Sequence, residues 1–251
     1  MAAEPSGMTT VEALEYACAS HPGVWAERRL AFANEPHHWE WYELELRHRR
    51  LCVVAPREHG KSEVFSVNRT AHMVCYRPGS WQYIFSQTVT QAKLILERIV
   101  SMVAQVAPEL VDGAHRFSTS EVIFGNHARV TVASVGQSVR GPHPDRIVGD
   151  DILEEATTLT AYQRKRLERW WFGTVAPMAH PGVHRPLRWS GEQRSAKLWH
   201  PATTIVLVGT PFHKLDLLMS MKENPMYSFR RYAAEFREED LIPGTMSVEA
   251  A

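Results

Sequence analysis

The chain has 251 residues, which suits one large α/β domain, and 44% of them are hydrophobic, enough to bury a sizeable core. Lysine plus arginine and aspartate plus glutamate both number 28, so the formal net charge is zero and no global field draws the protein to nucleic acid. The segment Met1–Thr10 lacks the features of a secretory signal, and no apolar run is long enough to span a membrane. Composition therefore argues against secretion and membrane insertion.

The cysteines and histidines give no sign of a metal site. The three cysteines, Cys18, Cys52 and Cys75, are odd in number, widely spaced and set in apolar surroundings. This pattern is typical of reduced core residues in an intracellular protein. The 13 histidines are scattered without the spacing of metal ligands, so we expect no structural zinc.

The amino-terminal 30 residues are predicted to form a loose tail and one helix. Thr9-x-x-Glu12 is a capping box, and apolar residues follow it at near-helical spacing until Pro22-Gly23 ends the helix. An aromatic-rich stretch, residues 32–46, comes next. Its rings have two interpretations, a surface for an adenine base or part of the core, and we favour the core.

The most informative stretch is a short apolar strand, residues 51–54, followed by a turn that ends in Gly-Lys-Ser and a segment that can be helical. A phosphate-binding loop is built in this way, because backbone N–H groups and the positive end of a helix dipole face the phosphates. Lys61 would reach the β- and γ-phosphates, and the Ser62 hydroxyl would bind Mg²⁺. Ala55 stands where the usual pattern G-x-x-x-x-G-K-[ST] has its first glycine. The residues predicted to bind nucleotide are Pro56, Arg57, Glu58, His59, Gly60, Lys61 and Ser62.

Strands and helices then alternate along the chain. This alternation predicts an α/β fold with a mostly parallel central sheet flanked by helices. Capping residues, apolar periodicity and turn signals set the expected bounds. The predicted elements are a helix at 63–75, a strand at 81–86, a long helix capped by Thr90 and ending before Pro108, and two strands at 118–124 and 128–134 joined at Gly125-Asn126.

A second group of polar residues follows a short apolar strand that ends in Asp150-Asp151, with Glu154 and Glu155 one turn further on. Paired acids at such a point suit a Mg²⁺-nucleotide site, because one carboxylate holds the metal's water shell and a second orients the attacking water. We assign Asp150 to the metal and Asp151 to the water, and Glu154 and Glu155 remain alternatives for the second role. An isolated Asp-Asp could instead cap a helix. This pair, however, follows the Gly-Lys-Ser turn by about 90 residues, a common separation for the two halves of such a site.

A basic helix is predicted at 161–172, where four cations, Arg164, Lys165, Arg166 and Arg169, lie beside two tryptophans. The helix could face DNA, with its aromatic rings interleaved among the cations. It could equally present a solvated basic face and bury its tryptophans, and we favour this second interpretation.

The remaining segments are a loop and two strands. Residues 180–201 lack periodicity and are predicted to form an exposed, mobile loop. A buried strand at 203–208 leads to Thr210, which is expected beside the phosphate loop because the carboxyl ends of parallel strands meet at one edge. A last strand at 229–236 precedes the acidic run 238–240, which we interpret as solvated charge rather than a metal site.

Three motifs in this order and spacing resemble the ATPase domain of phage terminase large subunits, the motors that package viral DNA. Ala55-Pro56-Arg57-x-His59-Gly60-Lys61-Ser62 is similar to that family's deviant phosphate loop. Arg140-Gly141 before Asp150-Asp151 is similar to its Arg-Gly element and Walker B strand. Gly209-Thr210-Pro211-Phe212-His213 with Asp216-Leu217 is similar to its coupling motif. The resemblance covers about residues 30 to 240.

The resemblance implies a P-loop NTPase fold of the RecA-like additional-strand type. That domain would span residues 31–240, between an amino-terminal tail and helix at 1–30 and a carboxyl-terminal tail at 241–251. Its activity would be hydrolysis of ATP to ADP and phosphate with Mg²⁺, which would drive packaging of double-stranded DNA into a procapsid.

The resemblance also implies roles for individual residues. Arg57 would contact the γ-phosphate in cis, and Arg140 would be a trans-acting arginine finger inserted into a neighbour's site. Such a finger stabilises charge on the transferring phosphoryl group. Thr210 would link hydrolysis to movement of DNA. With the acids, the expected catalytic residues are Asp151, Glu154, Arg57, Arg140 and Thr210.

The partners implied are double-stranded DNA, a portal protein and a small terminase subunit. The chain would be a monomer in isolation and a homo-oligomeric ring on the portal, with no membrane partner. It would be phage-encoded, in the host cell cytoplasm and transiently at the procapsid portal.

Two departures from the family keep alternatives open. Asp151 stands where the family has its catalytic glutamate, and the family's nuclease domain has no counterpart before Ala251. We therefore expect an excised domain, a split gene product or a motor that borrows its nuclease. The alternatives are a helicase-like DNA-dependent ATPase and a nucleotide-binding scaffold subunit with little catalysis. A nuclease is the weakest interpretation.

Overall fold

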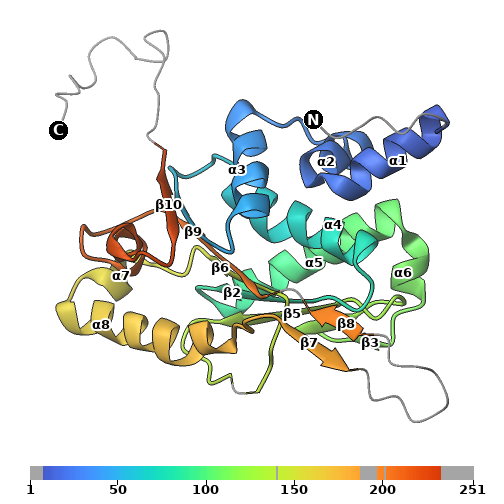
Figure 1. The fold of residues 1–251 in the computed structure, drawn as a ribbon. Coiled ribbons are helices and arrows are strands. Elements are labelled where there is room, and N and C mark those ends of the chain that lie inside the picture. Colours follow the sequence, from blue (N-terminus) through green and yellow to red (C-terminus); the bar gives the residue numbers. More distant parts are fainter. Residues whose placement is uncertain (1–7, 140, 187–196, 201, 233–251) are drawn as a thin grey trace, which may run out of the picture.

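An eight-stranded sheet runs through the middle of the protein (Figure 1). The computed structural model describes residues 8–139, 141–186, 197–200 and 202–232. The strands of this sheet are β1 (Arg50–Val54), β2 (Trp81–Ser86), β3 (Arg116–Phe117), β4 (Glu121–Ile123), β5 (Arg129–Ser134), β6 (Arg146–Asp150), β9 (Thr204–Gly209) and β10 (Ser228–Arg231). They lie in the order β10-β1-β9-β6-β2-β5-β4-β3. Neighbours from β10 to β5 are parallel, and β5-β4 and β4-β3 are antiparallel.

This topology confirms the predicted α/β fold of the additional-strand type. β9 lies between β1, which precedes the Gly-Lys-Ser turn, and β6, which ends in Asp150. The parallel strands end level with one another, because the register pairs Val54 with Gly209 and Asp150 with Val208. Polar residues that follow these strands are thereby gathered at one edge of the sheet.

Helices cover both faces of the sheet, with α3, α4 and α5 on one side and α8 on the other (Figure 1). Their bounds are α1 (Thr10–Ser20), α2 (Pro22–Leu30), α3 (Pro36–Arg47), α4 (Arg69–Tyr76), α5 (Val89–Val106), α6 (Pro108–Asp112), α7 (Glu155–Thr158), α8 (Ala161–Trp170) and α9 (Leu217–Ser220). Two π-helices, η1 (Ser62–Asn68) and η2 (Trp171–Val175), precede α4 and follow α8. Two short 3₁₀ segments are η3 (Ala176–Met178) and η4 (Met221–Glu223). Among the described residues, none of these helices has the length and apolarity needed to cross a membrane.

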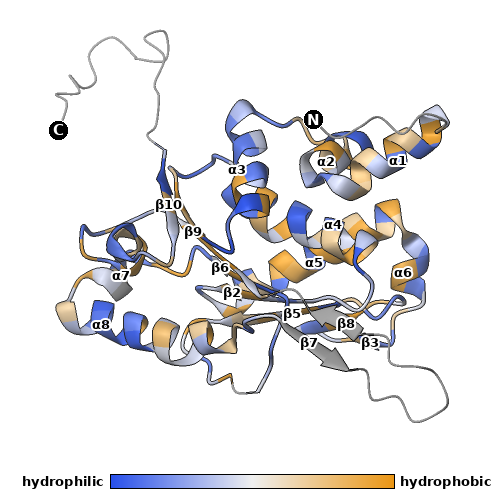
Figure 2. Cartoon of the chain, in the orientation of Figure 1, coloured by the Kyte–Doolittle hydropathy of each residue, from blue (hydrophilic) through white to orange (hydrophobic). Residues whose placement is uncertain are grey.

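The core is divided between the two faces because successive strand residues point to opposite sides. Ile84 of β2 packs with α5 residues such as Ile99 on one face, whereas Phe85 packs with the fully buried Trp171 on the other. Figure 2 shows hydrophobic residues concentrated on the strands and on α5. The apolar periodicity that predicts the long helix is therefore explained by its burial against the sheet.

Several elements differ from the expectations. The capping box at Thr9 is confirmed, but α2 and α3 add two helices before β1. The long helix is capped by Thr88, whose hydroxyl accepts from the Gln91 N–H at 3.2 Å, so the assignment of Thr90 as its cap is wrong. Residues 183–186 and 197–200 form the antiparallel strands β7 (Val183–Pro186) and β8 (Lys197–His200), where the sequence predicts a loop.

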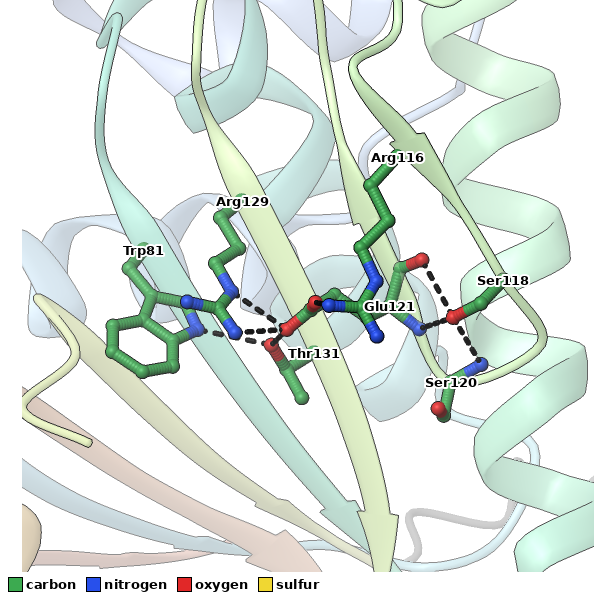
Figure 3. Close-up of polar contacts among 7 residues, drawn as sticks. All are labelled: Trp81, Arg116, Ser118, Ser120, Glu121, Arg129 and Thr131. Atoms are coloured by element: carbon green, nitrogen blue, oxygen red, sulfur yellow. Dashed lines mark hydrogen bonds and ion pairs between the residues drawn. The ribbon is translucent and has the colours of Figure 1, made fainter. Parts of the chain in front are cut away.

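The antiparallel edge of the sheet is tied to the parallel part by one buried carboxylate, that of Glu121 (Figure 3). Arg129 Nε donates to Glu121 Oε2 at 2.6 Å, and the Thr131 hydroxyl donates to the same oxygen at 3.0 Å. On the other side, Arg116 Nη1 lies 3.1 Å from Glu121 Oε1. The Arg129 guanidinium also lies over the Trp81 ring of β2, 4.1 Å from its centroid. The short strands β3 and β4 are thus held by charge pairing as well as by backbone bonds.

A second buried ion cluster ties α3 to β6 and to the helices after the Gly-Lys-Ser turn. Glu45 accepts from Arg146 Nε and Nη2 at 2.6 and 2.9 Å, and Arg69 Nε lies 3.3 Å from its Oε1. Arg146 also donates to the Phe65 carbonyl at 2.7 Å and to the Thr70 hydroxyl at 3.1 Å. The cluster therefore fixes the start of β6 against η1 and α4.

Candidate nucleotide site

The candidate site is built at the carboxyl ends of β1, β9 and β6. The Gly-Lys-Ser turn follows β1, Thr210 follows β9, and β6 ends at Asp150 with Asp151 next in the chain. Residues far apart in sequence meet there, because these three strands are neighbours and parallel.

The turn between β1 and η1 has the backbone of a loop that wraps around a ligand. Glu58 and Gly60 adopt positive φ angles of 66° and 74°, which turn the chain sharply before the helix. The first helical bond then runs from the Val64 N–H to the Gly60 carbonyl at 2.9 Å. Ala55, in place of the usual first glycine, is buried and does not adopt a positive φ. Its backbone therefore has no need for a glycine.

Lys61 is buried, with 5% of its surface exposed, and its ammonium is folded back onto the loop. Nζ donates to the carbonyls of Ala55 at 2.9 Å and Pro56 at 2.5 Å, and it lies 3.4 Å from the Thr210 hydroxyl. Burial lowers the pKa of Lys61, and the charges of Asp151 and Asp150 act in the opposite direction. The ammonium is thus held by weak carbonyl partners beside two carboxylates.

Ser62 and Asp150 meet although 88 positions separate them, with the Ser62 hydroxyl donating to Asp150 Oδ1 at 2.8 Å. The second oxygen, Oδ2, is buried and makes no hydrogen bond of regular geometry among the described residues, although the Ser66 hydroxyl is close enough to lower the pKa of Asp150. A hydroxyl and a carboxylate are the hard oxygen ligands that Mg²⁺ prefers, and an unpaired buried carboxylate oxygen is costly unless a cation or donor satisfies it. These residues therefore fit the metal that the sequence predicts.

The buried Asp150 carboxylate lowers the stability of the folded protein at neutral pH. Burial, reinforced by the charge of Asp151, raises the pKa of Asp150 to about 6. Between its ordinary pKa and about 6 the folded state holds more protons than the unfolded state, so stability falls as the pH rises through this window. At pH 7.5 the cost is on the order of 2–3 kcal/mol.

We therefore expect Asp150→Asn to raise the melting temperature by several degrees at pH 7.5 in buffer without Mg²⁺. The gain should shrink toward pH 4, where folded Asp150 is protonated and the pH approaches the ordinary carboxyl pKa of 3.8. Thermal melts at the two pH values measure it, with the exposed Asp112→Asn as control. A lower melting temperature for Asp150→Asn at pH 7.5 would contradict this account.

The acids after β6 lie on the open side of the site. Asp151 is exposed, adopts a positive φ of 43°, and has its Oδ1 packed against Gly209, 3.2 Å from where a Cβ would lie. Glu154 Oε2 accepts from Gln87 Nε2 at 2.8 Å. Gln87 directly follows β2, so a fourth strand end contributes to the site.

A cavity of about 620 Å³ adjoins these residues, a size typical of small-ligand sites. Its lining includes Arg57, Thr210 and Phe212, together with the acids Asp151, Glu154 and Glu155. The cavity therefore brings together the predicted γ-phosphate contact and all three candidates for the water-activating acid.

The segment after β9 is organised by one buried carboxylate. Asp216 Oδ2 accepts from the backbone N–H groups of Phe212 and His213 at 2.9 and 3.0 Å, and its Oδ1 caps α9. The Arg57 guanidinium lies 5.6 Å from the centroid of the Phe212 ring. The Thr210 hydroxyl donates to the Ala55 carbonyl at 3.2 Å. The motif at 209–217 thus contacts the phosphate loop at two places.

The remaining sequence predictions concern Arg140, the acidic run, the basic helix and the aromatic stretch. Arg140 and the acidic run 238–240 lie outside the described residues. In α8, Leu167 is buried and Arg164 Nη1 donates to the Thr158 carbonyl at 2.6 Å, whereas Arg166 and Arg169 are exposed. The aromatic stretch before β1 forms α3, and Trp41 of that helix is fully buried. This burial agrees with the core interpretation of the stretch.

Two solved structures resemble the domain along most of its length. The large terminase ATPase domain of Thermus phage P74-26 gives a TM-score of 0.59 at 15% identity, covering 85% of this chain and 86% of that chain. An arginine-to-alanine mutant of the same domain gives 0.57 at 13% identity, covering 84% and 86%. The chain has the fold of a terminase ATPase domain. No protein-family model and no curated protein matches the sequence.

Sequence reasoning missed several side chains at this candidate site. Gln87 has no motif of its own, although its place at the end of a predicted strand was a usable signal. The sequence marks His37 and His38 only as members of an aromatic stretch, yet both side chains contact the His59 carbonyl in the turn after β1. Thr88-x-x-Gln91, a capping-box pattern, was present in the sequence and marks the true start of α5.

Proposed function

We propose that this protein is the ATPase motor domain of a viral terminase large subunit, which hydrolyses ATP to drive packaging of double-stranded DNA into a procapsid. The observation that carries the proposal is the contact between Ser62 and Asp150, on a fold shared with a terminase ATPase domain. It joins the Gly-Lys-Ser turn to the paired acids, and the second Asp150 oxygen makes no hydrogen bond of regular geometry among the described residues.

The geometry of the loop supports the proposal that it binds ATP. Lys61 would exchange its contacts with the Ala55 and Pro56 carbonyls for phosphate oxygens, which carry full charge and bind an ammonium more strongly. Ser62 and Asp150 would hold Mg²⁺, which supplies positive charge to the phosphates. Arg57, on the wall of the cavity, would reach the γ-phosphate.

Hydrolysis needs a carboxylate that orients water opposite the leaving phosphate. Asp151 is the first candidate, because its negative charge raises the pKa of Lys61 more than the charge of Asp150 does. Glu154 is the second, because Gln87 fixes its carboxylate at the cavity. Arg140 of a neighbouring subunit would complete the site in a ring on the portal, and Thr210 would report the state of the γ-phosphate to the segment that Asp216 organises. The other partners would be duplex DNA and a small terminase subunit, in the cytoplasm of the infected host.

The test is steady-state phosphate release with Mg²⁺-ATP over a wide range of protein concentration, with and without duplex DNA. A motor whose sites are completed between subunits should show activity that rises more than linearly with concentration. In the same assay the most damaging of Asp151→Asn, Glu154→Gln and Glu155→Gln identifies the acid that orients water. ATP binding without hydrolysis at any concentration, with DNA present, would favour a nucleotide-binding scaffold, and strand separation in an unwinding assay would favour a helicase.

A further inference from the structure

Three histidines donate to carbonyls of the phosphate loop. His37 Nε2 and His38 Nε2 lie 3.2 and 3.0 Å from the His59 carbonyl oxygen. His59 Nδ1 in turn lies 2.8 Å from the Arg57 carbonyl oxygen. A carbonyl oxygen has two lone pairs and no proton, so each of these imidazole nitrogens must be the donor. The His59 carbonyl is therefore saturated by two side chains of α3.

The protonation of His38 is fixed by its other nitrogen. Nδ1 accepts from the Glu35 backbone N–H at 3.0 Å, at the start of α3. An imidazole that accepts at Nδ1 and donates at Nε2 is neutral and in a single tautomer. His38 is also buried, with 6% of its surface exposed, between Phe32 and Trp41. The ring is thus held in place from all sides and cannot turn away from the loop.

The His59 carbonyl and the Gly60 N–H belong to the same peptide unit. In a planar trans peptide the C=O and N–H bonds point to opposite sides. Because the carbonyl points at His37 and His38, the Gly60 N–H points away from α3. In a phosphate-binding loop the backbone N–H groups are the groups that hold the anion.

The fit between His38 and the loop leaves no room for a side chain. A Cβ added to Gly60 would lie 2.7 Å from His38 Nε2, well inside the sum of the atomic radii. Gly60 also adopts a φ of 74°, which favours glycine independently. The His38 ring is therefore packed directly against the backbone of Gly60.

We propose that His38, supported by His37, is a positioning residue for the phosphate loop: it holds the His59 carbonyl on the outer side, so that the Gly60 N–H of the same peptide faces the bound triphosphate. This inference rests on the proposed function, because it assigns the phosphates to the inner side of the loop. It adds a residue from α3, upstream of β1, to the binding machinery.

Low pH should weaken the contact between His38 and the His59 carbonyl. Burial lowers the pKa of His38, the bond to the His59 carbonyl acts in the opposite direction, and the titratable groups facing the ring are His37, Glu35 and His59. A protonated His38 would carry a hydrogen on Nδ1 and could no longer accept the Glu35 N–H. Because the folded pKa is below the ordinary value, stability contributed by this contact is lost as the pH falls through the region below about 6.5.

The experiment compares His38→Ala with His38→Gln, whose side-chain amide keeps an N–H donor but cannot titrate. Displacement of a fluorescent ATP analogue measures the affinities of Mg²⁺-ATP, inorganic tripolyphosphate and adenosine, and thermal melts measure stability. His38→Ala should weaken ATP and tripolyphosphate about tenfold, while His38→Gln should stay within about threefold of wild type and bind ATP without the loss that wild type shows toward acid pH.

The matched control is His21→Ala. His21 Nε2 lies 3.0 Å from Glu43 Oε1 of α3, and this pair does not include a residue of the loop. The substitution should lower the melting temperature and leave the affinities unchanged. The proposal is overturned if His38→Ala binds tripolyphosphate as tightly as wild type, or if His38→Gln loses as much affinity as His38→Ala at an equal melting temperature. A wild-type protein that binds neither ATP nor tripolyphosphate would instead refute the proposed function.

Discussion

Lys61→Ala is expected to reduce the rate of ATP turnover by about 100- to 1000-fold, the cost of removing one preorganised donor from a developing negative charge. In the absence of nucleotide the Lys61 ammonium rests on the carbonyls of Ala55 and Pro56, so it already lies at the mouth of the loop. Phosphate oxygens would displace these neutral partners. The alanine variant has nothing to make that exchange, and both binding and stabilisation of the transferring phosphoryl group should fail.

Phosphate release beside wild type measures this loss, and Lys222→Ala in η4, which removes an exposed lysine away from the loop, is the control. The folded state should survive the Lys61 change, because burial already disfavours the charge and lowers the pKa of Lys61. A near-normal melting temperature with lost turnover supports the assignment. Hydrolysis at the wild-type rate in a preparation free of contaminating ATPases would show that the loop is not part of the active site.

The parts of the site that sequence predicts are those whose signal is local. The Gly-Lys-Ser turn and the paired acids at Asp150 each combine a short apolar strand with polar residues at fixed spacing, and parallel strand topology then forces them together. Gln87 follows a predicted strand but belongs to no spaced motif, and its contact with Glu154 depends on β2 lying beside β6. The role of His38 depends on the path of α3 over the loop, which no periodicity encodes. Arg140, predicted from the resemblance, stays a prediction because it lies outside the described residues.

The fold shows the same division. β2 is predicted to the residue, because Pro78-Gly79 ends the preceding helix and an aromatic and aliphatic run follows at once. The π-helical turns of η1 and η2 are not predicted, since their extra residue is accommodated by tertiary contacts such as the bond from Arg146 to the Phe65 carbonyl. The pair between Glu45 and Arg146 spans 101 positions, and each residue alone looks like a surface charge. Sequence patterns therefore fail mainly to predict polar contacts between residues that are far apart in the chain.

The largest stability effect is expected at that pair. Glu45→Gln keeps the size of the side chain but removes the only charge that compensates Arg146 and Arg69 in the described part of the cluster. Burial opposes ionisation of Glu45, yet the two arginines hold its pKa below the ordinary value, and burial lowers the pKa of Arg69 to about 10 despite the attraction of Glu45. Breaking such a buried pair from one side costs about 3–5 kcal/mol, because the remaining charges stay desolvated.

Urea unfolding of Glu45→Gln should show that loss as a lower midpoint with an unchanged slope. Glu43→Gln is the matched control on the same helix: its carboxylate pairs with the exposed Arg47 at 2.8 Å and with His21, and its loss should cost no more than about 1 kcal/mol. Equal losses from the two variants would mean that the cluster is solvated and does not fix β6. A much larger loss from Glu45→Gln would mean that the strand carrying Asp150 is positioned from its opposite end, by a residue of the helix that also supplies His38.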